Sequence, residues 1–355
     1  MKAGAPISLV LVLAVGGSTA FPCAAVPPVG HRAGVLGEQA LIVWDPARRM
    51  EHFVRRASFD SDAPDFGFLV PTPARPELAE APDAVFDALQ TAIQPEVVRR
   101  TGWHIQPTLL LFFPVLMLRT AVPPMTAVPP PPVRVLEQTQ VGGYDAAVLQ
   151  ADDAPALARW LEEHGYASRP ALQEWLRPYV ERHWTITAFK VGRAPGARGT
   201  ATQAVRMSFS AERPFFPYRE PADQREGLPA PRELLVYLVG PGRMEGTIGT
   251  DGRWPGELLY AAPASGITGA VASSVPPSAV PPAAWLSAFR DDSSPRPGVD
   301  DLFFAPAASG DRVLPPPTVI DERTSLPLPL DVLAVLALGA ILWRRRRVRR
   351  SRPLP

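Results

Sequence analysis

Residues 40–71 read ALIVWDPARRMEHFVRRASFDSDAPDFGFLVP and contain the pattern that decides the fold class. Apolar and aromatic residues gather over 40–44, 50–59 and 65–71, and each run has the length and composition of a strand. The proline and aspartate residues between the runs are typical of turns. A helical spacing of apolar residues follows over 83–94. The order strand, strand, strand, helix predicts an α+β fold with mainly antiparallel strands and a few short helices.

The second half of the chain shows the same mixture. Asp153 is placed to cap a helix in which Leu157, Trp160 and Leu161 share one face, and a second helix repeats this pattern over 172–180. The glycines at 240–246 match neither a dinucleotide fingerprint nor a P-loop, so they predict a turn between two strands. Further strands are predicted over 133–138, 145–150, 184–191, 205–209 and 234–239.

Proline divides the chain into segments. The 45 prolines among 355 residues are about 13%, against roughly 5% in average proteins. Residues 121–132 contain six of them, which predicts an extended linker or loop between an α+β segment at 21–120 and a second one at 133–260. Residues 261–325 are rich in proline, alanine and serine, and they predict a stalk with short ordered pieces such as 285–289.

The N-terminus has the three parts of a secretory signal peptide. Lys2 precedes an apolar stretch over 7–15, and small residues follow up to Ala20. We therefore predict a signal peptide over 1–20, and the alternative is a buried N-terminal strand or helix. Cys23 is the only cysteine, so no disulfide can form within the chain, and the residues before it do not fit the lipoprotein pattern.

The C-terminus has the pattern of a membrane anchor. Residues 326–343 are mostly apolar, and as a helix they would span about 27 Å of a hydrocarbon core that is roughly 30 Å thick. Asp331 and Trp343 would lie at the two interfaces, with the basic side in the cytoplasm. We predict one transmembrane helix over 326–343, a cytoplasmic tail over 344–355 and an exported ectodomain on a bacterial cell membrane; the alternative is a C-terminal core helix. The arginines at the inner flank are Arg344, Arg345, Arg346 and Arg347.

Charge argues against nucleic acid as a partner. The chain has 36 basic and 35 acidic residues, but seven of the basic ones fall in the last dozen positions. The part between the two terminal signals therefore carries about seven more acidic than basic side chains. Because binding to phosphates needs a basic folded face, the partners we expect are the membrane and an envelope protein or polymer.

No motif of a known reaction stands out. The five histidines are scattered, no Gly-x-Ser-x-Gly elbow is present, and no cofactor is predicted. Asp60, Asp62 and Asp65 are spaced so that one turn would offer oxygen ligands to Ca²⁺. The turn lacks the twelve-residue loop and the final glutamate of an EF-hand, so a solvated turn between strands is the alternative.

Several runs, taken in order, resemble a known family. They are residues 40–45, 51–59, 65–73 and 86–89, followed by 143–149, 160–166 and 179–180. Together they are similar to a bacterial family of exported proteins known as a domain of unknown function, number twenty-three thirty. The resemblance covers roughly 22–252, although the Cys-Gly-Gly start associated with that family is absent. It implies a signal peptide and, in many members, a C-terminal hydrophobic helix with an Arg-rich tail, but no reaction.

These observations favour a binding or structural module of the cell envelope over an enzyme. An anchored domain on a proline-rich stalk suits presentation to a partner. The alternative is an envelope hydrolase in which Asp62 and Asp65 divide general acid and base work beside His52. A concave pocket that holds these three side chains would favour the enzyme.

Overall fold

The computed structural model describes residues 24–108, 140–141, 144–151, 153–192, 199–225 and 232–350. The predicted signal peptide, Cys23, the proline-rich linker and the strand expected over 133–138 lie outside the described residues. The chain divides into two compact units. Unit 1 comprises Met1–Gln94 and Leu136–Pro315, and unit 2 comprises Pro95–Val135 and Pro316–Pro355.

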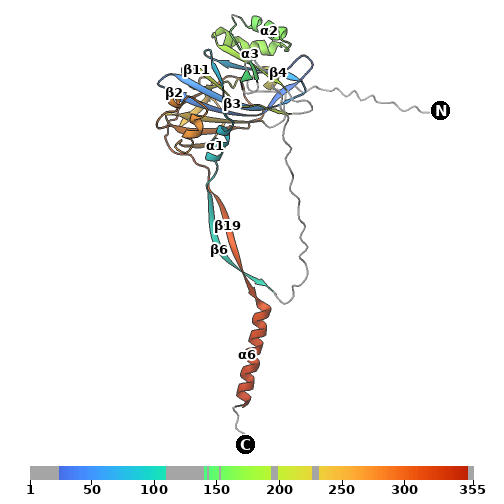
Figure 1. Cartoon of the computed structure of the whole chain (residues 1–355), viewed down its shortest axis with the longest axis vertical. Helices are drawn as coiled ribbons and strands as arrows, with labels where there is room; N and C mark the ends of the chain where they lie inside the picture. Colours follow the sequence, from blue (N-terminus) through green and yellow to red (C-terminus); the bar gives the residue numbers. More distant parts are fainter. Residues whose placement is uncertain are drawn as a thin grey trace, which may run out of the picture. The chain divides into compact units, whose positions relative to one another are not determined.

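Three sheets form the described part of unit 1 (Figure 1). The eight-stranded sheet has the order β16 (Glu257–Pro263), β17 (Trp285–Asp291), β13 (Glu233–Gly240), β2 (Ala33–Asp45), β3 (Met50–Ser61), β11 (Val205–Ser210) and β5 (Glu77–Glu80), and β10 (Gly199–Ala201) also pairs with β3. The five-stranded sheet has the order β1 (Ala24–Val26), β4 (Asp65–Thr72), β9 (Thr185–Gly192), β8 (Tyr144–Leu149) and β7 (Gln140–Val141). The four-stranded sheet has the order β12 (Phe215–Phe216), β18 (Leu302–Pro306), β14 (Met244–Ile248) and β15 (Gly252–Arg253). Within these sheets, paired strands are antiparallel except β2 and β13, which run parallel.

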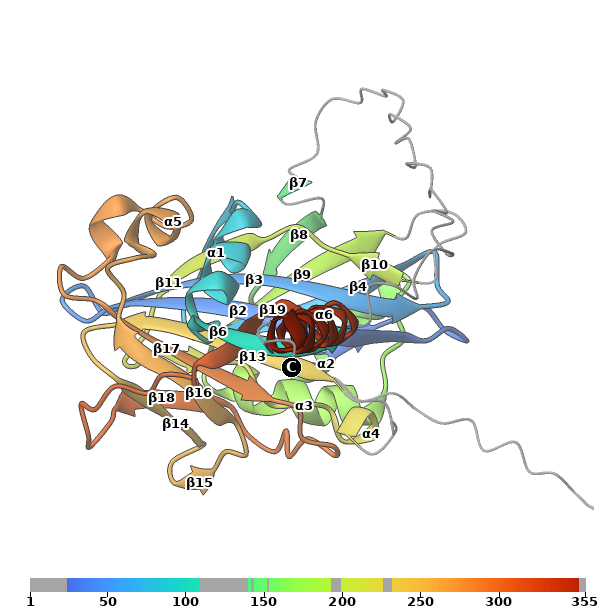
Figure 2. The ribbon, with the colours of Figure 1, turned by 90° about the horizontal axis from the view of Figure 1, so that it is seen from below.

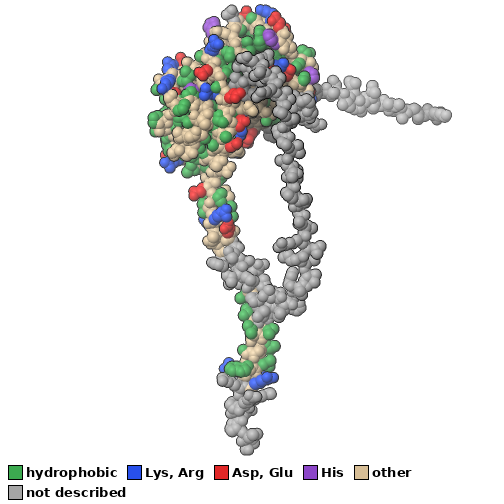
Figure 3. All heavy atoms as spheres, viewed as in Figure 1, with side chains coloured by type: hydrophobic (Ala, Val, Ile, Leu, Met, Phe, Trp, Pro, Cys, Tyr) green, Lys and Arg blue, Asp and Glu red, His purple; other side chains and the backbone are tan. Residues whose placement is uncertain are grey.

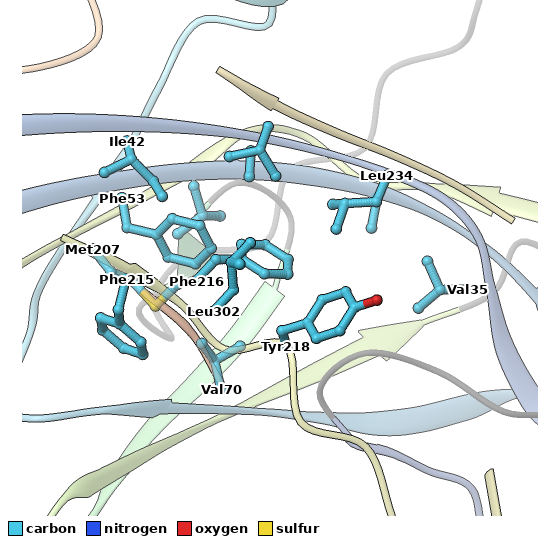
Figure 4. Packing of buried hydrophobic residues seen from close by; sticks show 14 of the residues in the cluster. Val35, Ile42, Phe53, Val70, Met207, Phe215, Phe216, Tyr218, Leu234 and Leu302 are labelled. Carbon is cyan, nitrogen blue, oxygen red and sulfur yellow. The ribbon is translucent and has the colours of Figure 1, made fainter. Parts of the chain in front are cut away.

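The main core lies between the inner faces of these sheets. Alternate residues of β2 and β3, such as Ile42 and Phe53, point into it, together with Val70 of β4. The four-stranded sheet adds Phe215 and Leu302 to the same cluster (Figure 4). Each of these five side chains is nearly or fully removed from solvent, so burial of apolar surface from all three sheets holds the unit together.

Short helices cover the outer faces of the two larger sheets. Trp175 and Leu161 pack on Leu69 of the five-stranded sheet, and Phe86 and Val43 belong to a separate cluster outside the eight-stranded sheet. The order of layers is therefore helix, sheet, sheet, helix, as the views in Figure 1 and Figure 2 allow the reader to follow. The helices are α1 (Ala84–Ala92), α2 (Ala154–Glu163), α3 (Pro170–Glu181), α4 (Ala222–Arg225) and α5 (Thr268–Ala272), with a short 3₁₀ helix at Pro277–Ala279.

The predicted fold class is confirmed: the described protein is mixed α+β, with mostly antiparallel sheets and several short helices. The three runs within 40–71 form β2, β3 and β4. Asp153 caps α2, since its carboxylate accepts a hydrogen bond from the backbone N–H of Ala156 at 2.6 Å. The glycine-rich stretch after β13 leads directly into β14, as predicted for a turn between strands.

The division into segments differs from the prediction. β2 pairs with β13 and β4 pairs with β9, so single sheets contain strands from both sides of the proline-rich stretch. Residues 261–315, expected to belong to a stalk, lie in unit 1 and contain α5, β17 and β18. Leu286, Phe289 and Phe304 of this region are buried in the core clusters. Burial of a few well-spaced apolar residues is therefore enough to fold this region into unit 1, although its composition is otherwise typical of a linker.

The described part of unit 2 is a two-stranded ribbon followed by a helix. β6 (Val97–Thr108) and β19 (Thr318–Pro329) pair in parallel along their whole length (Figure 1). α6 (Leu330–Arg350) follows β19 without an intervening loop.

This helix begins four residues later than the predicted membrane anchor at 326–343. Residues 326–329 form the end of β19 and pair with β6. Pro327 and Pro329 lack the backbone N–H that a helix interior requires, and each disfavours helical geometry in the residue before it, so the helix begins after them. Among the described residues, no helix has both the length and the apolar character needed to cross a membrane.

Candidate ligand pocket on the eight-stranded sheet

A pocket of about 370 Å³ lies on the outer face of the eight-stranded sheet, beside the start of α1. It forms next to a β-bulge between Val35 and Gly37 of β2, an irregularity of the kind that re-aims side chains at sheet edges and sites. Its volume falls within the range of roughly 300 to 1,000 Å³ that is usual for small-ligand pockets. The lining residues are Gly37, Glu38, Gln39, Arg56, Ala57, Ser58, Asp83, Ala201, Thr202 and Glu233.

Arg56 is the fixed cation of this pocket. Its Nε donates to Gln39 Oε1 at 3.0 Å, and its Nη2 donates to Asp87 Oδ1 at 3.2 Å. Its guanidinium lies 4.9 Å from the centre of the Phe86 ring. These contacts, with a donation from Nη1 to the Asp83 carbonyl oxygen at 3.5 Å, hold the side chain in one orientation. The side chain remains 25% exposed, and a guanidinium has five N–H donors, so it can donate further hydrogen bonds to a ligand.

Further polar side chains surround the same hollow. Asp83 Oδ1 accepts from the backbone N–H of Ala204 at 2.9 Å, and Thr202 Oγ1 donates to the Ala57 carbonyl oxygen at 2.8 Å. The Glu233 side chain is exposed at the beginning of β13. The pocket therefore offers both donors and acceptors, and its lining includes no histidine, cysteine or lysine. This composition suits a ligand with hydroxyl and amide groups better than a strongly charged one.

An apolar hollow of about 460 Å³ lies on the other side of α1. It is lined by Ala88, Thr91, Ala92, Tyr260, Pro263, Ala264, Gly266, Ile267 and Leu286. Small residues predominate, and no charged side chain enters the lining. It offers contact area beside the Arg56 pocket but no group that would fix a ligand's orientation.

The predicted aspartates lie around the turn between β3 and β4, where they have separate partners. Asp62 accepts from the backbone N–H of Arg32 at 2.6 Å, and this hydrogen bond lowers the pKa of the carboxyl below its usual value. Asp65 pairs with Lys190 at 3.2 Å, and Asp60 is exposed at the end of β3. Among the described residues, no three His, Cys, Asp or Glu side chains gather into a group that could hold a metal ion.

His52 lies at the opposite end of β3. Asp60 lies eight positions further along the strand, which is roughly 26 Å. His52 Nδ1 lies 2.8 Å from the hydroxyl of Ser208, which stands directly across from it on β11, and burial lowers the pKa of the imidazole. The fold therefore does not bring His52 to Asp62 and Asp65, and the predicted hydrolase arrangement is not assembled.

Charged side chains buried inside unit 1 were missed by the sequence reasoning. Glu38 and Arg55 are 3% and 5% exposed, and Arg55 Nη2 lies 2.8 Å from Glu38 Oε1. The guanidinium also lies 4.0 Å from the centre of the Phe68 ring on β4, so it spans the gap between the two larger sheets. Two further buried pairs are Glu220 with Arg232 at 3.2 Å and Asp291 with Arg296 at 3.8 Å. In each of these three pairs a buried acid has a buried base as its partner, which suits a structural role.

Fold and pocket together define an α+β protein with a polar, ligand-sized hollow. A family model described as uncharacterized protein conserved in bacteria (DUF2330) matches residues 17–252, and the chain belongs to this family. No curated protein sequence matches the chain. Among solved structures, the crystal structure of baculovirus P35 is similar with a TM-score of 0.36 and 8% identity, covering 81% of this chain and 97% of that one. A TM-score this low does not establish a shared fold.

Proposed function

We propose that this protein is a membrane-attached protein of the bacterial cell envelope, and that unit 1 binds a polar partner in the pocket beside Arg56 rather than catalysing a reaction. The observation that carries the proposal is the fixed but partly exposed guanidinium within a hollow of about 370 Å³. Donors and acceptors of both kinds beside it fit a segment of sugar or peptide from an envelope polymer. The hydrogen bond that Asp62 accepts, the separate ion pair of Asp65, and the distance of both from His52 support binding over hydrolysis.

Replacement of Arg56 with glutamine is expected to weaken binding of soluble peptidoglycan fragments by the full chain roughly 10- to 100-fold, since a hydrogen bond from a charged donor contributes about 1.5 to 3 kcal/mol. Fluorescence polarisation with labelled fragments measures this. Arg206→Gln is the matched control, because Arg206 pairs with Glu77 on the same sheet and does not line the pocket.

Three outcomes would count against this proposal. They are equal binding by the Arg56→Gln and Arg206→Gln variants, no binding by the wild-type chain, and release of shorter fragments from the polymer. The last of these would favour the hydrolase. Should Arg56→Gln lower the thermal stability, Glu233→Ala provides a second test, because this side chain is exposed and also lines the pocket.

The attachment to a membrane rests on α6. Its large apolar side chains are 45–64% exposed on all sides of the helix, with exposed arginines directly after them. A helix that is apolar all round suits lipid, and arginines beside it suit anionic headgroups. The exposed apolar residues are Leu333, Val335, Leu336, Leu338, Ile341, Leu342 and Trp343.

Removal of residues 316–355 is therefore expected to shift the protein from the carbonate-washed membrane fraction to the soluble fraction. Each large apolar side chain that leaves water contributes roughly 1.5 to 3 kcal/mol, so loss of the whole set should abolish attachment. Replacing Arg344, Arg345 and Arg346 with glutamine is the control for electrostatic adhesion, and it should leave most of the protein bound. Full-length protein in the soluble fraction would contradict the proposal.

A further inference from the structure

The ribbon of β6 and β19 is unusual because it is a two-stranded parallel sheet with no further described strand beside it. Its two strands are parallel and twelve residues long, and within the described residues each pairs only with the other. Parallel strands are normally buried on both faces, and isolated two-stranded ribbons are marginally stable in water. Along one edge of each strand, the backbone N–H and C=O groups therefore have no described β partner. Such an unpaired edge is the usual template to which a further strand adds.

The faces of the ribbon are also exposed over 97–101 and 318–322. Every side chain from Val97 to Thr101 and from Thr318 to Glu322 is exposed. The set includes four β-branched apolar residues, which favour strands and usually lie against a neighbour. They are Val97, Val98, Val319 and Ile320, exposed by 53%, 36%, 44% and 41%.

Charges on the two strands are complementary. β6 carries Arg99 and Arg100, and β19 carries Asp321 and Glu322, which Arg323 follows opposite Gly102. Within the chain, Arg99 pairs with Glu322, and Asp321 is the register partner of Arg100. Red and blue side chains accordingly lie close together on the ribbon in Figure 3. β6 is therefore basic over 97–101, and β19 is acidic over the paired stretch 318–322.

This polarity selects one mode of association between copies. If β19 of a second copy lies beside β6 in the same register, it places Asp321 across from Arg100, and Glu322 across from Thr101 and diagonal to Arg99. The same oppositely charged side chains that meet within the chain therefore meet between copies. Pairing β6 with β6, or β19 with β19, in the same register would place like charges side by side, which is destabilising. Of these same-register pairings, only a sheet in which β6 and β19 alternate places opposite charges side by side.

We infer that this chain self-associates by parallel strand addition, with the β6 edge of one copy pairing with the β19 edge of the next. The contact is heterologous, so it closes into a ring or continues as a row. Because α6 follows β19 directly, the helices of neighbouring copies run in the same direction, with their apolar side chains at the same level. The inference goes beyond the proposed function and does not depend on the Arg56 pocket.

A charge-swapped chain tests the inference. Arg99→Glu, Arg100→Glu, Asp321→Arg and Glu322→Arg in one chain reverse both edges and keep opposite charges within each ribbon. Wild-type and swapped chains are co-expressed at full length with different tags and purified in detergent. We expect wild type to copurify with wild type and swapped with swapped, and the mixed pair to copurify at least tenfold less. Circular dichroism and thermal melting establish that both chains fold alike.

Equal copurification of the mixed pair would overturn the inference, because association would then lie elsewhere in the chain. A wild-type chain that is monomeric by light scattering in detergent would overturn it as well. If the swapped chain does not fold, single cysteines serve instead, in a Cys23→Ser background. Thr101→Cys in one tagged copy and Glu322→Cys in another are expected to form a disulfide between chains, whereas two Thr101→Cys copies are not. Equal cross-linking in both mixtures would also overturn the inference.

Discussion

Replacement of Arg55 with methionine is expected to lower the free energy of unfolding by about 3 to 5 kcal/mol at pH 7. Arg55 is buried, and its Nη2 lies 2.8 Å from Glu38 Oε1. Without the guanidinium, the Glu38 carboxylate is left in the core without its nearest counter-charge. Burial already raises the pKa of the Glu38 carboxyl, although Arg55 acts to lower it. The loss in the variant should therefore shrink as the pH falls and Glu38 takes up a proton.

Two further variants distinguish the stability loss caused by a buried unpaired charge from the loss caused by breaking an exposed ion pair. Arg55→Met combined with Glu38→Leu removes both charges, and it should lie within about 2 kcal/mol of wild type, because apolar replacement of a buried pair is often neutral. Arg290→Met breaks the exposed pair with Glu257 at 3.1 Å, and should cost less than about 1 kcal/mol. Urea unfolding of each full chain, followed by tryptophan fluorescence, gives the comparison. An Arg55→Met loss as small as that of Arg290→Met would contradict the expectation.

The strands and helices of unit 1 were predictable where local pattern and tertiary packing agree. The alternation over 50–59 forms β3, because Phe53, Ala57 and Phe59 all face the main core, and Leu157 and Leu161 of α2 likewise pack together in one buried cluster. Pairing between distant strands has no such local signal. β2 lies beside β13, nearly two hundred residues later, and only the packed sheet places them together.

The candidate pocket could not be predicted, because its lining comes from separate strands and loops that meet only in the folded sheet. Gly37, Arg56, Asp83 and Glu233 share no motif or spacing along the chain. The buried pair of Glu38 and Arg55 did leave a signal, since both fall in step with inward-facing apolar residues of their strands. A charge at an inward position indicates a buried partner, but the sequence does not say which residue it is.

The stability of unit 1 is expected to fall as the pH rises from 5 to 8, and Asp301 accounts for about 3 kcal/mol of that fall. Asp301 is 1% exposed, and burial raises the pKa of its carboxyl to about 7. Hydrogen bonds from the Tyr179 hydroxyl at 2.9 Å and the Arg219 N–H at 3.3 Å oppose that shift without cancelling it. In the unfolded chain the same carboxyl loses its proton near pH 4. The folded state therefore binds the extra proton below pH 7, and this stabilisation is lost as the pH rises through the folded pKa.

Asp301→Asn should remove that part of the pH dependence, because an amide cannot ionise and its oxygen can still accept from Tyr179. Glu220, whose pKa burial also raises to about 7, keeps a residual slope in the variant. Carboxyls with lowered pKa values, such as Asp291, act in the opposite sense only at more acidic pH, so the measurement begins at pH 5. His52, whose pKa burial lowers, makes stability rise with pH below about 7, but it does so equally in both variants and cancels in their comparison. Asp292→Asn is the matched control, since this neighbouring carboxylate is exposed. Urea unfolding at pH 5, 6, 7 and 8 gives four free energies of unfolding for each chain, and these define its pH dependence. An Asp301→Asn curve parallel to that of Asp292→Asn would show that Asp301 is ionised in the folded protein throughout this range.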